Sequence, residues 1–425
     1  MKLPVSSCQA KPICDAGQDG SVRRSRLTAI LAAGLMAVGF GTASSLAFAQ
    51  TGSSPSPTRP TAHAYVDAAS TCPAAAIPGT NLSRGDHYVA APSSTASDTL
   101  TGRKPVLVVF LGGSYTKPED YVDISEYVAS IGYGVINLSY PNDFTVGAAC
   151  NNEAGCYGSL RGEVAFGRNI DYTVPSSNPG YGYNSGKVAG NISRVDSVVN
   201  RLVCLIDYLG NNGAQSDDIP GDDYWQQFLK VDSNSPYITP NAGRVYPDWS
   251  KIVVAGHSQG GGEAAFLGMR LPLLEPVRRV VMLSSPEDST GSQGQPAPWM
   301  TYAANTPMNR FWGLWAGSQE GVYGEHVGGN WSGFGGPFIS GVGGDKTGGV
   351  GRVTSVPVVE IPLSRNGTIN LNSNRFQLQE NLGFSALRYH RSTSGNCAAL
   401  DNDCSQIREF LKPVWNYMFS GGYTD

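Results

Sequence analysis

Residues 251–268 read KIVVAGHSQGGGEAAFLG, and the order of residue types in this stretch decides the fold that we expect. The apolar run 251–256 predicts a buried strand, and the alanine-rich residues that follow predict a helix. Ser258 lies at the turn between them, inside the pattern Gly-x-Ser-x-Gly. Glycine on both sides lets the backbones of a sharp strand-to-helix turn pass close together. Such a turn would expose the Ser258 hydroxyl above the sheet, at the start of a helix whose free N–H groups favour negative charge.

Alternating strand and helix signals continue on both sides of this turn. Further apolar runs predict strands over 105–111, 134–140, 278–285 and 310–317, and a weaker strand over 353–361, which contains Pro357. Apolar residues at helical spacing predict helices over 118–134, 191–209 and 405–419, the last despite Pro413. This alternation is typical of an α/β fold in which helices flank a mostly parallel sheet.

Two long stretches interrupt the alternation, 141–190 and 210–250. The first is irregular and rich in glycine, asparagine and tyrosine, and each lies between two predicted sheet strands. We expect them to form lid-like insertions over the strand ends rather than an independent domain. The expected domain spans residues 63–425, after a Ser/Pro/Thr-rich linker over 50–62.

The N-terminal residues have the pattern of a secretory signal peptide. Three arginines precede the apolar run 27–40, and Ala47-Phe48-Ala49 supplies an A-x-A cleavage site before Gln50. We therefore expect residues 1–49 to be removed on export to the periplasm or the exterior. A translation start near Val22 would account for the residues upstream of the pattern. Neither this apolar run nor any later one is long enough to predict a transmembrane segment.

Composition limits the classes of function. The chain has 425 residues, of which 15% are charged, and a formal net charge of −4. Residues 1–49 hold five Lys/Arg and two Asp/Glu, so their removal leaves 25 basic and 32 acidic residues and a net charge of −7. Nucleic-acid binding needs a clustered basic surface, so we expect no nucleic-acid partner. Histidine is scarce and the cysteine spacings suit no standard zinc site, so we expect no metal. We also expect no cofactor, because the serine chemistry inferred below needs none.

Six cysteines follow residue 49, and an even number in an exported chain favours disulfides. Two pairs are close together in polar stretches and are predicted to close small loops: Cys150 with Cys156, and Cys397 with Cys404. Elimination leaves Cys72 and Cys204 as a third pair, although Cys204 lies in a helical pattern and also fits a buried thiol.

The turn at Ser258, GHSQGGGEAA, resembles that of the α/β-hydrolase family, and the resemblance covers most of residues 105–420, including the order of strands. More narrowly, the chain is similar to a group of exported bacterial hydrolases, through the stretches FLGGSYTKPEDY, GYGVINLSYPND, RVVMLSSPED and PVWNYM. The resemblance implies that Ser258 is a nucleophile, activated by a histidine that an acidic residue orients. The chain order in this family is nucleophile, acid, histidine.

Two histidines follow Ser258, namely His326 and His390. His390 lies in a predicted loop after the last predicted strand, where the family places its base, whereas His326 precedes that strand. We therefore predict His390 as the base. The remaining three histidines are not expected to take this role: His63, His87 and His257.

Two positions compete for the acid. Glu320 follows the predicted strand 310–317, which delivers the acid in this family, although most relatives would have aspartate there. Asp288 or Glu287 follows the preceding strand, an alternative site in some hydrolases. We predict Glu320 as the acid and keep the other two as alternatives.

The tetrahedral intermediate of such a reaction carries an oxyanion that needs fixed donors. One is expected to be the backbone N–H of Gln259, directly after the nucleophile. The second is expected to be the N–H of Ser114, in the glycine-rich turn FLGGSYT after the first strong strand. Aromatic residues are plentiful in the late loops and the predicted lid, but core packing explains such residues as well, so none is assigned to the site.

These residues together predict a secreted serine hydrolase that cleaves small-molecule or polymeric carboxylic esters through an acyl-enzyme. Two alternatives stay open: a peptidase or amidase that uses the same residues, and a non-catalytic exported binding protein on the same fold. The sequence does not determine the acyl group, the alcohol or the oligomeric state.

Overall fold

A nine-stranded sheet organises the computed structural model, in which the described residues are 61–71, 85–92, 103–167, 192–213, 219, 223–270, 275–290, 295–301, 304–321, 326–327, 330–331, 359–361, 375–378, 386–395 and 402–420. All of them belong to one unit, Ala49–Asp425. The predicted signal peptide over residues 1–49 lies outside the described residues, and so does most of the predicted linker.

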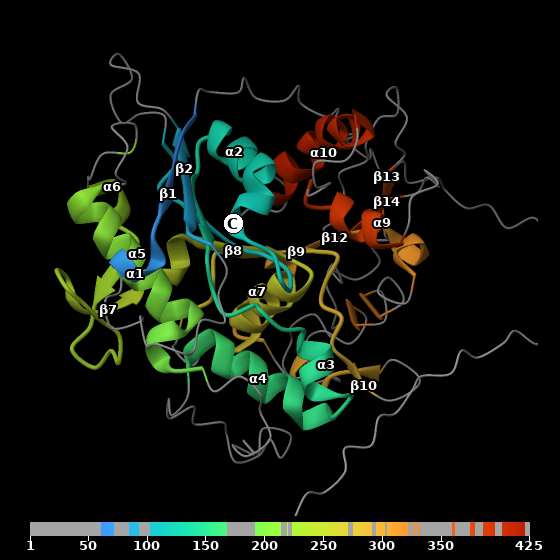
Figure 1. Cartoon of the computed structure of the whole chain (residues 1–425), viewed down its shortest axis with the longest axis horizontal. Helices are drawn as coiled ribbons and strands as arrows, with labels where there is room; N and C mark the ends of the chain where they lie inside the picture. The colour runs from blue at the N-terminus through green and yellow to red at the C-terminus, as the bar shows by residue number, and fades with distance from the viewer. Residues whose placement is uncertain are drawn as a thin grey trace, which may run out of the picture. The chain divides into compact units, whose positions relative to one another are not determined.

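The strand order of this sheet is β1-β2-β4-β3-β8-β9-β12-β14-β13 (Figure 1). The strands are β1 (Thr61–Val66), β2 (His87–Pro92), β3 (Leu107–Leu111), β4 (Gly134–Leu138), β8 (Ile252–His257), β9 (Arg279–Leu283), β12 (Phe311–Trp315), β13 (Val359–Ile361) and β14 (Arg375–Leu378). Every neighbouring pair from β4 to β13 is parallel, and only β1–β2 and β2–β4 are antiparallel. The prediction of a mostly parallel α/β sheet is therefore confirmed.

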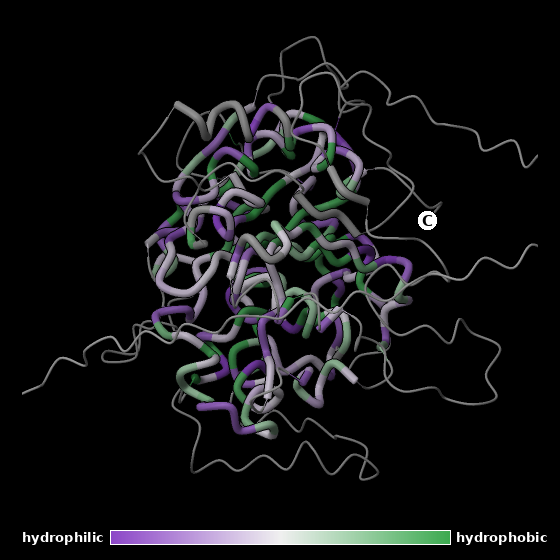
Figure 2. Tube along the Cα trace, turned by 90° about the vertical axis from the view of Figure 1, so that its right-hand side faces the viewer, coloured by the Kyte–Doolittle hydropathy of each residue, from purple (hydrophilic) through white to green (hydrophobic). Residues whose placement is uncertain are grey.

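The central strands are continuous apolar runs because both faces of the sheet are covered. Successive residues of a strand point to opposite faces, and alternate residues of β3 and β8 accordingly join two different core clusters. Helices α4 (Ala154–Phe166), α5 (Val198–Asn212) and α7 (Gln259–Arg270) contribute to one cluster, and α2 (Val122–Ser130) and α10 (Asn402–Ser420) to the other. Figure 2 shows hydrophobic stretches, in green, within the body of the described trace.

The long predicted helices are present, with shifted ends. The helix expected over 118–134 begins as the 3₁₀-helix η2 (Pro118–Tyr121) and continues as α2, and the helix expected over 191–209 is α5. The last predicted helix is α10, which contains Pro413 in its interior. Over the described residues, no helix has the length and apolarity that a membrane span requires.

The two long insertions contain more regular structure than the sequence predicted. The first holds α3 (Val146–Cys150) and α4, and α4 contacts both α5 and α7. The second holds α6 (Asp223–Gln226) and a three-stranded sheet of order β5-β7-β6, formed by Leu229–Val231, Gly243–Pro247 and Ile238–Thr239. Glycine within α4 weakens the helical signal of the sequence, and the packing of Leu160 and Val164 into the core compensates for it.

The remaining described elements are short. They are α1 (Ala68–Thr71), α9 (Ala386–Ser392) and the hairpin of β10 (Ser289–Thr290) with β11 (Gln295–Pro296). The sequence reading did not include β1, β2 or β14. Strand β14 pairs with β12 over three positions only, too few for a periodic pattern to be read.

One predicted disulfide is confirmed. Cys150 and Cys156 are bonded, with Cα atoms 5.3 Å apart, and their bond joins the end of α3 to the first turn of α4. Cys204 on α5 is also disulfide-bonded, so it is not a free buried thiol. Its predicted partner Cys72 lies outside the described residues, as does Cys397, and the side chain of Cys404 is not described.

Candidate active site

A pocket of about 600 Å³ lies where several parallel strands end. Ser258 and Gln259 after β8, Glu287 after β9 and His390 on α9 line it. The turn after β3, residues 113–116, and the start of the first insertion, residues 145–148, form further parts of the wall. Among the described residues, the second insertion contributes no side chain to this lining.

Ser258 occupies the turn between β8 and α7 with a strained backbone. Its φ is 53°, in the left-handed region that residues other than glycine rarely adopt. The Ser258 N–H donates to the carbonyl of Leu283 at 2.9 Å, and the Ser258 carbonyl accepts from the N–H of Gly262 at 3.1 Å. These bonds tie the turn to the neighbouring strand and to the first helical turn, so the hydroxyl is held at the pocket surface.

The glycines on either side of Ser258 have no room for a side chain. A Cβ on Gly260 would lie 2.1 Å from the carbonyl oxygen of Leu111, and one on Gly256 would lie 2.4 Å from the Gly260 backbone. Both distances are far below van der Waals contact. The glycines are therefore required by the close approach of three backbones, as the sequence predicted.

His390 and Glu320 are brought into direct contact. The Nδ1–H of His390 donates to Oε2 of Glu320 at 2.8 Å, and both residues are buried. Glu320 lies at the end of the 3₁₀-helix η8 (Gly317–Glu320), directly after β12. Its other oxygen, Oε1, accepts from the Ser284 hydroxyl at 2.9 Å and from the N–H of Ala316 at 2.5 Å. Three donors therefore fix the Glu320 carboxylate.

The predicted loop around His390 is instead the helix α9, which is a correction to the sequence analysis. The sequence RSTSG suggests a loop, because serine and threonine favour turns. In the structure, the hydroxyls of Ser392, Thr393 and Ser394 donate to the carbonyls three residues earlier, of Tyr389, His390 and Arg391. These bonds satisfy the C-terminal carbonyls of the helix and explain how so polar a sequence is helical.

Opposing effects act on the pKa of the His390 imidazole. Burial disfavours the charged form, but the hydrogen bond to Glu320 and the charges of Glu287 and Glu320 outweigh it, so the pKa of His390 is raised. The ring therefore becomes neutral, and able to accept a proton, at a higher pH than an unperturbed histidine does.

The two alternative acids occupy different surroundings from Glu320. Asp288 is buried, receives two hydrogen bonds from Arg161 at 2.5 and 2.6 Å, and accepts a third from the indole N–H of Trp299 at 2.9 Å. Glu287 lies on the other side of the His390 ring, with Oε1 3.4 Å from Nε2. Of the three candidates, only Glu320 meets Nδ1 in a hydrogen bond among the described contacts.

The two residues expected to bind an oxyanion, Ser114 and Gln259, are in contact at the pocket wall. The hydroxyl of Ser114 donates to Oε1 of Gln259 at 2.7 Å. The N–H groups on either side of Ser114 are used within the protein, by Tyr121 Oη for Gly113 and by the Asn142 carbonyl for Tyr115. The N–H of Ser114 itself has no acceptor among the residues that the structure describes.

His257 connects the turn after β3 to the helix that carries His390. Tyr121 Oη accepts from the N–H of Gly113 at 2.9 Å and donates to Nδ1 of His257 at 3.0 Å. The opposite nitrogen, Nε2, then carries the hydrogen and donates to the His390 carbonyl at 2.9 Å. Burial and the charge of His390 keep the pKa of His257 well below its usual range, so this ring is neutral.

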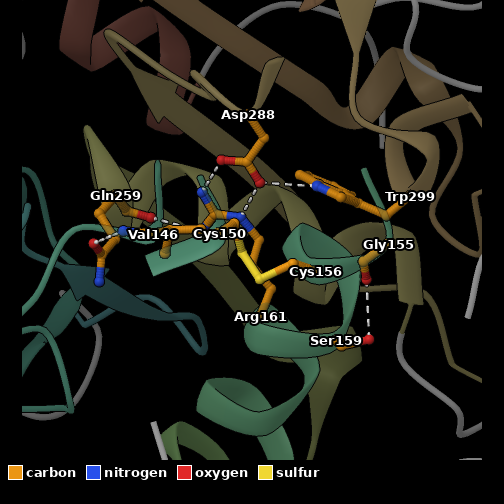
Figure 3. Close-up of a disulfide and its surroundings, with 9 residues drawn as sticks. All are labelled: Val146, Cys150, Gly155, Cys156, Ser159, Arg161, Gln259, Asp288 and Trp299. Carbon is orange, nitrogen blue, oxygen red and sulfur yellow. Dashed lines mark hydrogen bonds and ion pairs between the residues drawn. A yellow bond between two sulfur atoms is a disulfide. The ribbon is translucent and has the colours of Figure 1, made fainter. Parts of the chain in front are cut away.

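A buried ion cluster under the pocket was missed by the sequence analysis. Arg161 on α4 contacts Asp288 and, at 3.1 Å, the Gln259 carbonyl (Figure 3). It also donates to Oε1 of Glu263 at 2.9 Å. Burial raises the pKa of Glu263 to about 8, although Arg161 opposes the shift. The cluster thus joins the first insertion to the helix that begins after Ser258. The signal in the sequence was weak, since one arginine in a glycine-rich stretch usually lies on the surface.

Two further pocket residues were not assigned from the sequence. Tyr115 is half-exposed, has a φ of 59° and lines the pocket directly after Ser114. Its place next to the glycine-rich turn was the signal that could have identified it. His326, the other histidine after Ser258, also lines the pocket. The predicted acid Glu320 is hydrogen-bonded to His390 and not to His326 in the described contacts. His63 and His87 are not part of the described lining.

Comparisons with known proteins identify no family. No family model matches the sequence, and no curated protein matches it significantly. Two solved structures of a thermophilic esterase from the planctomycete Thermogutta terrifontis are similar at low level. The native form is 13% identical with a TM-score of 0.23, over 55% of this chain and 65% of that chain, slightly less than two thirds of its length. The propionate-bound form is 12% identical with a TM-score of 0.24, over 57% and 74%. Likeness at this level carries no argument about function.

Proposed function

We propose that the protein is a serine hydrolase of the α/β-hydrolase type, which cleaves carboxylic esters through an acyl-enzyme. One observation carries the proposal: a serine on a strained strand-to-helix turn shares a pocket with a histidine whose Nδ1–H is bonded to a buried carboxylate. A serine hydroxyl is a weak nucleophile, and it needs a base that is itself held in one tautomer.

In the proposed reaction, Oγ of Ser258 attacks the ester carbonyl carbon while its proton passes to Nε2 of His390. Glu320 holds the other ring nitrogen and stabilises the imidazolium that forms. The N–H groups of Gln259 and Ser114 bind the oxyanion of the tetrahedral intermediate. The intermediate then expels the alcohol, which takes the proton from His390. Water enters by the same sequence of steps and releases the acid.

The local structure supports these roles in two ways. The glycines at 256 and 260 allow close backbone approach, which leaves the nucleophile at a surface that substrate can reach. The Gln259 side chain also accepts from Ser114 and from the N–H of Val146 at 3.2 Å, which fixes the turn that provides the second oxyanion donor. Donors fixed before the reaction need no reorganisation in the transition state.

Replacement of the nucleophile tests the proposal directly. Ser258→Ala is expected to lower kcat for p-nitrophenyl esters by a factor of about 10⁴ or more, because the nucleophile and base act as a unit. Its folding should be preserved, since the hydroxyl packs against little. Ser250→Ala, at an exposed position outside the pocket, serves as the control.

A fluorophosphonate probe gives a second measurement that needs no chosen substrate. The probe should label Ser258 in the wild-type protein and leave Ser258→Ala unlabelled. An unlabelled wild-type protein would favour the binding-protein alternative. Preference for p-nitroanilides over p-nitrophenyl esters would favour the amidase alternative.

We also propose that the protein is exported. The signal-peptide pattern of residues 1–49 supports this, and the Cys150–Cys156 disulfide is of a kind that persists in oxidising compartments. Mass analysis of protein secreted by an expressing cell should give an N-terminus near Gln50.

A further inference from the structure

Glu287 approaches the reacting nitrogen of the proposed base. Its Oε1 lies 3.4 Å from Nε2 of His390, whereas Glu320 binds Nδ1 on the other side of the ring. The imidazole therefore lies between two carboxylates, and only one of them is needed to orient it. The proposed triad gives no role to the second carboxylate, that of Glu287.

The backbone around Glu287 is held on both sides. The indole N–H of Trp331 donates to the Ser285 carbonyl at 2.8 Å, and the side-chain amide of Asn330 donates to the Pro286 carbonyl at 2.9 Å. After Glu287 in the chain, the Asp288 carboxylate accepts two hydrogen bonds from Arg161. Because these partners are buried, the main chain that carries Glu287 is fixed beside the His390 ring. The fold thus places the Glu287 carboxylate within reach of Nε2.

Glu287 acts on His390 through its charge rather than through a hydrogen bond. Its Oε1 is buried without a hydrogen-bond partner among the described residues, while the side chain as a whole is 24% exposed to the pocket. Burial raises the pKa of Glu287 to about 7, with His390 pulling in the opposite direction. The charge beside Nε2 therefore changes in the pH range in which a histidine also titrates.

Several other charged or titratable groups surround the pair. They are Glu320 on η8, Arg391 on α9, Asp288 next in the chain, Arg161 on α4, and the pocket-lining His257 and His326. The charge of Asp288 is paired with that of Arg161, and the His257 ring is uncharged. Glu287 is consequently the nearest negative charge on the Nε2 side of the ring.

We propose that Glu287 is a second carboxylate of the base, whose negative charge stabilises the proton that His390 Nε2 takes from Ser258. This inference rests on the proposed function. In the step concerned, the O–H bond of Ser258 breaks as its Oγ bonds to the ester carbon, and the proton goes to Nε2 and later to the alcohol oxygen. Glu287 forms no bond and receives no proton in this sequence. Its protonation removes the added stabilisation.

Proton NMR of the histidine rings tests the inference without turnover. The chain has five histidines, so the His390 signal can be assigned by its loss in His390→Gln. Glu287→Gln is expected to lower the pKa of His390 by about one unit, because an opposite charge within a few ångströms shifts a pKa by that amount or more. Glu119→Gln removes an equal charge from an exposed position and should leave the His390 titration unchanged. An unchanged pKa in Glu287→Gln would overturn the proposal.

The pH dependence of ester hydrolysis provides a second test of the role of Glu287. In Glu287→Gln, the acidic limb of kcat/KM should move to lower pH by the shift found by NMR, and the plateau should fall several-fold. A limb that stays in place while the NMR titration moves would also overturn the proposal. If the wild-type protein hydrolyses no ester, the proposed function fails, but the titration still decides whether Glu287 acts on His390. Glu287→Ala removes the same charge and replaces the glutamine variant if that variant does not fold.

Discussion

At the scale of single residues, the contacts of three carboxylates separate their roles. Glu320, Glu287 and Asp288 all follow sheet strands, and the sequence favoured Glu320 but left the other two as alternatives. In the structure, Glu320 meets Nδ1 of His390, Glu287 lies near Nε2, and Asp288 is bound by Arg161. Side-chain direction at the strand ends makes this distinction, and the sequence pattern contains no information about it.

The acid of the proposed triad can be tested by shortening it. Glu320→Ala is expected to lower kcat/KM by about 10³–10⁴, because the carboxylate fixes the tautomer of His390 and stabilises its charged form. Glu320→Asp should be impaired to a smaller extent, since it withdraws the carboxylate from a 2.8 Å hydrogen bond. Steady-state kinetics on a p-nitrophenyl ester measures both variants.

Asp288→Asn is the comparison variant for the acid. It keeps a side chain of the same shape, and any loss of activity should be accompanied by loss of stability, because it weakens the bond to buried Arg161. A stable Asp288→Asn protein with no activity, together with an active Glu320→Ala protein, would reverse the assignment.

At the scale of elements, the junction of β8 and α7 determines where the nucleophile lies. Backbones of β3, β8 and α7 meet at Gly256 and Gly260, and a methyl group at either position would overlap backbone atoms. The sequence analysis predicted this junction because strand, turn and helix signals occur in one continuous stretch. It missed β14 and the helical character of α9, since three paired residues and a run of hydroxyl side chains carry little periodic signal.

Alanine substitution at the junction tests the steric argument. Gly260→Ala is expected to lower the free energy of unfolding by about 3 kcal/mol or to prevent folding, because the added Cβ would lie 2.1 Å from a carbonyl oxygen. Gly147→Ala on α3 is a matched control, since a Cβ there meets nothing within 4 Å. Its stability should stay the same or rise slightly with the better helix propensity of alanine. Urea denaturation measures both, and equal stabilities would contradict the argument.

At the scale of the whole molecule, the parallel sheet gathers residues that lie far apart in the sequence. The turn after β3, Ser258, Glu287, Glu320 and His390 come from five segments, and the carboxyl ends of parallel strands bring them to one edge. The motif at Ser258 and the order of the strands were therefore enough to predict that these segments lie at one edge of the sheet. The wall formed by the first insertion was not predictable in detail, because its polar contact with the site runs through Arg161, whose burial the sequence does not indicate.

The buried cluster also predicts how global stability depends on pH. Burial raises the pKa of Glu263 from 4.5 to about 8, so the folded state binds more protons than the unfolded state between these values. Stability should therefore fall as pH rises through this window, with a slope of up to about 1.4 kcal/mol per pH unit from this group.

Glu263→Gln removes the titration and keeps an oxygen that can accept from Arg161. The variant should match the wild-type protein near pH 5 and become progressively more stable than it towards pH 8. Urea denaturation at several pH values measures the difference, with Glu119→Gln as an exposed control. A constant difference across this range would contradict the assignment of the shift to Glu263.

The attachment of the first insertion also has a use in protein engineering. Residues 145–148, together with Asn152 and Tyr157, form one side of the pocket, and none of them belongs to the proposed proton relay. A chimaera that exchanges residues 146–166 could thus acquire a new substrate range with the catalytic groups unaltered. It would need to retain an arginine at the place of Arg161, because Asp288 would otherwise be a buried charge without a counterion. The guanidinium of Arg161 is therefore the one group that an exchanged segment 146–166 has to keep for Asp288 to remain paired.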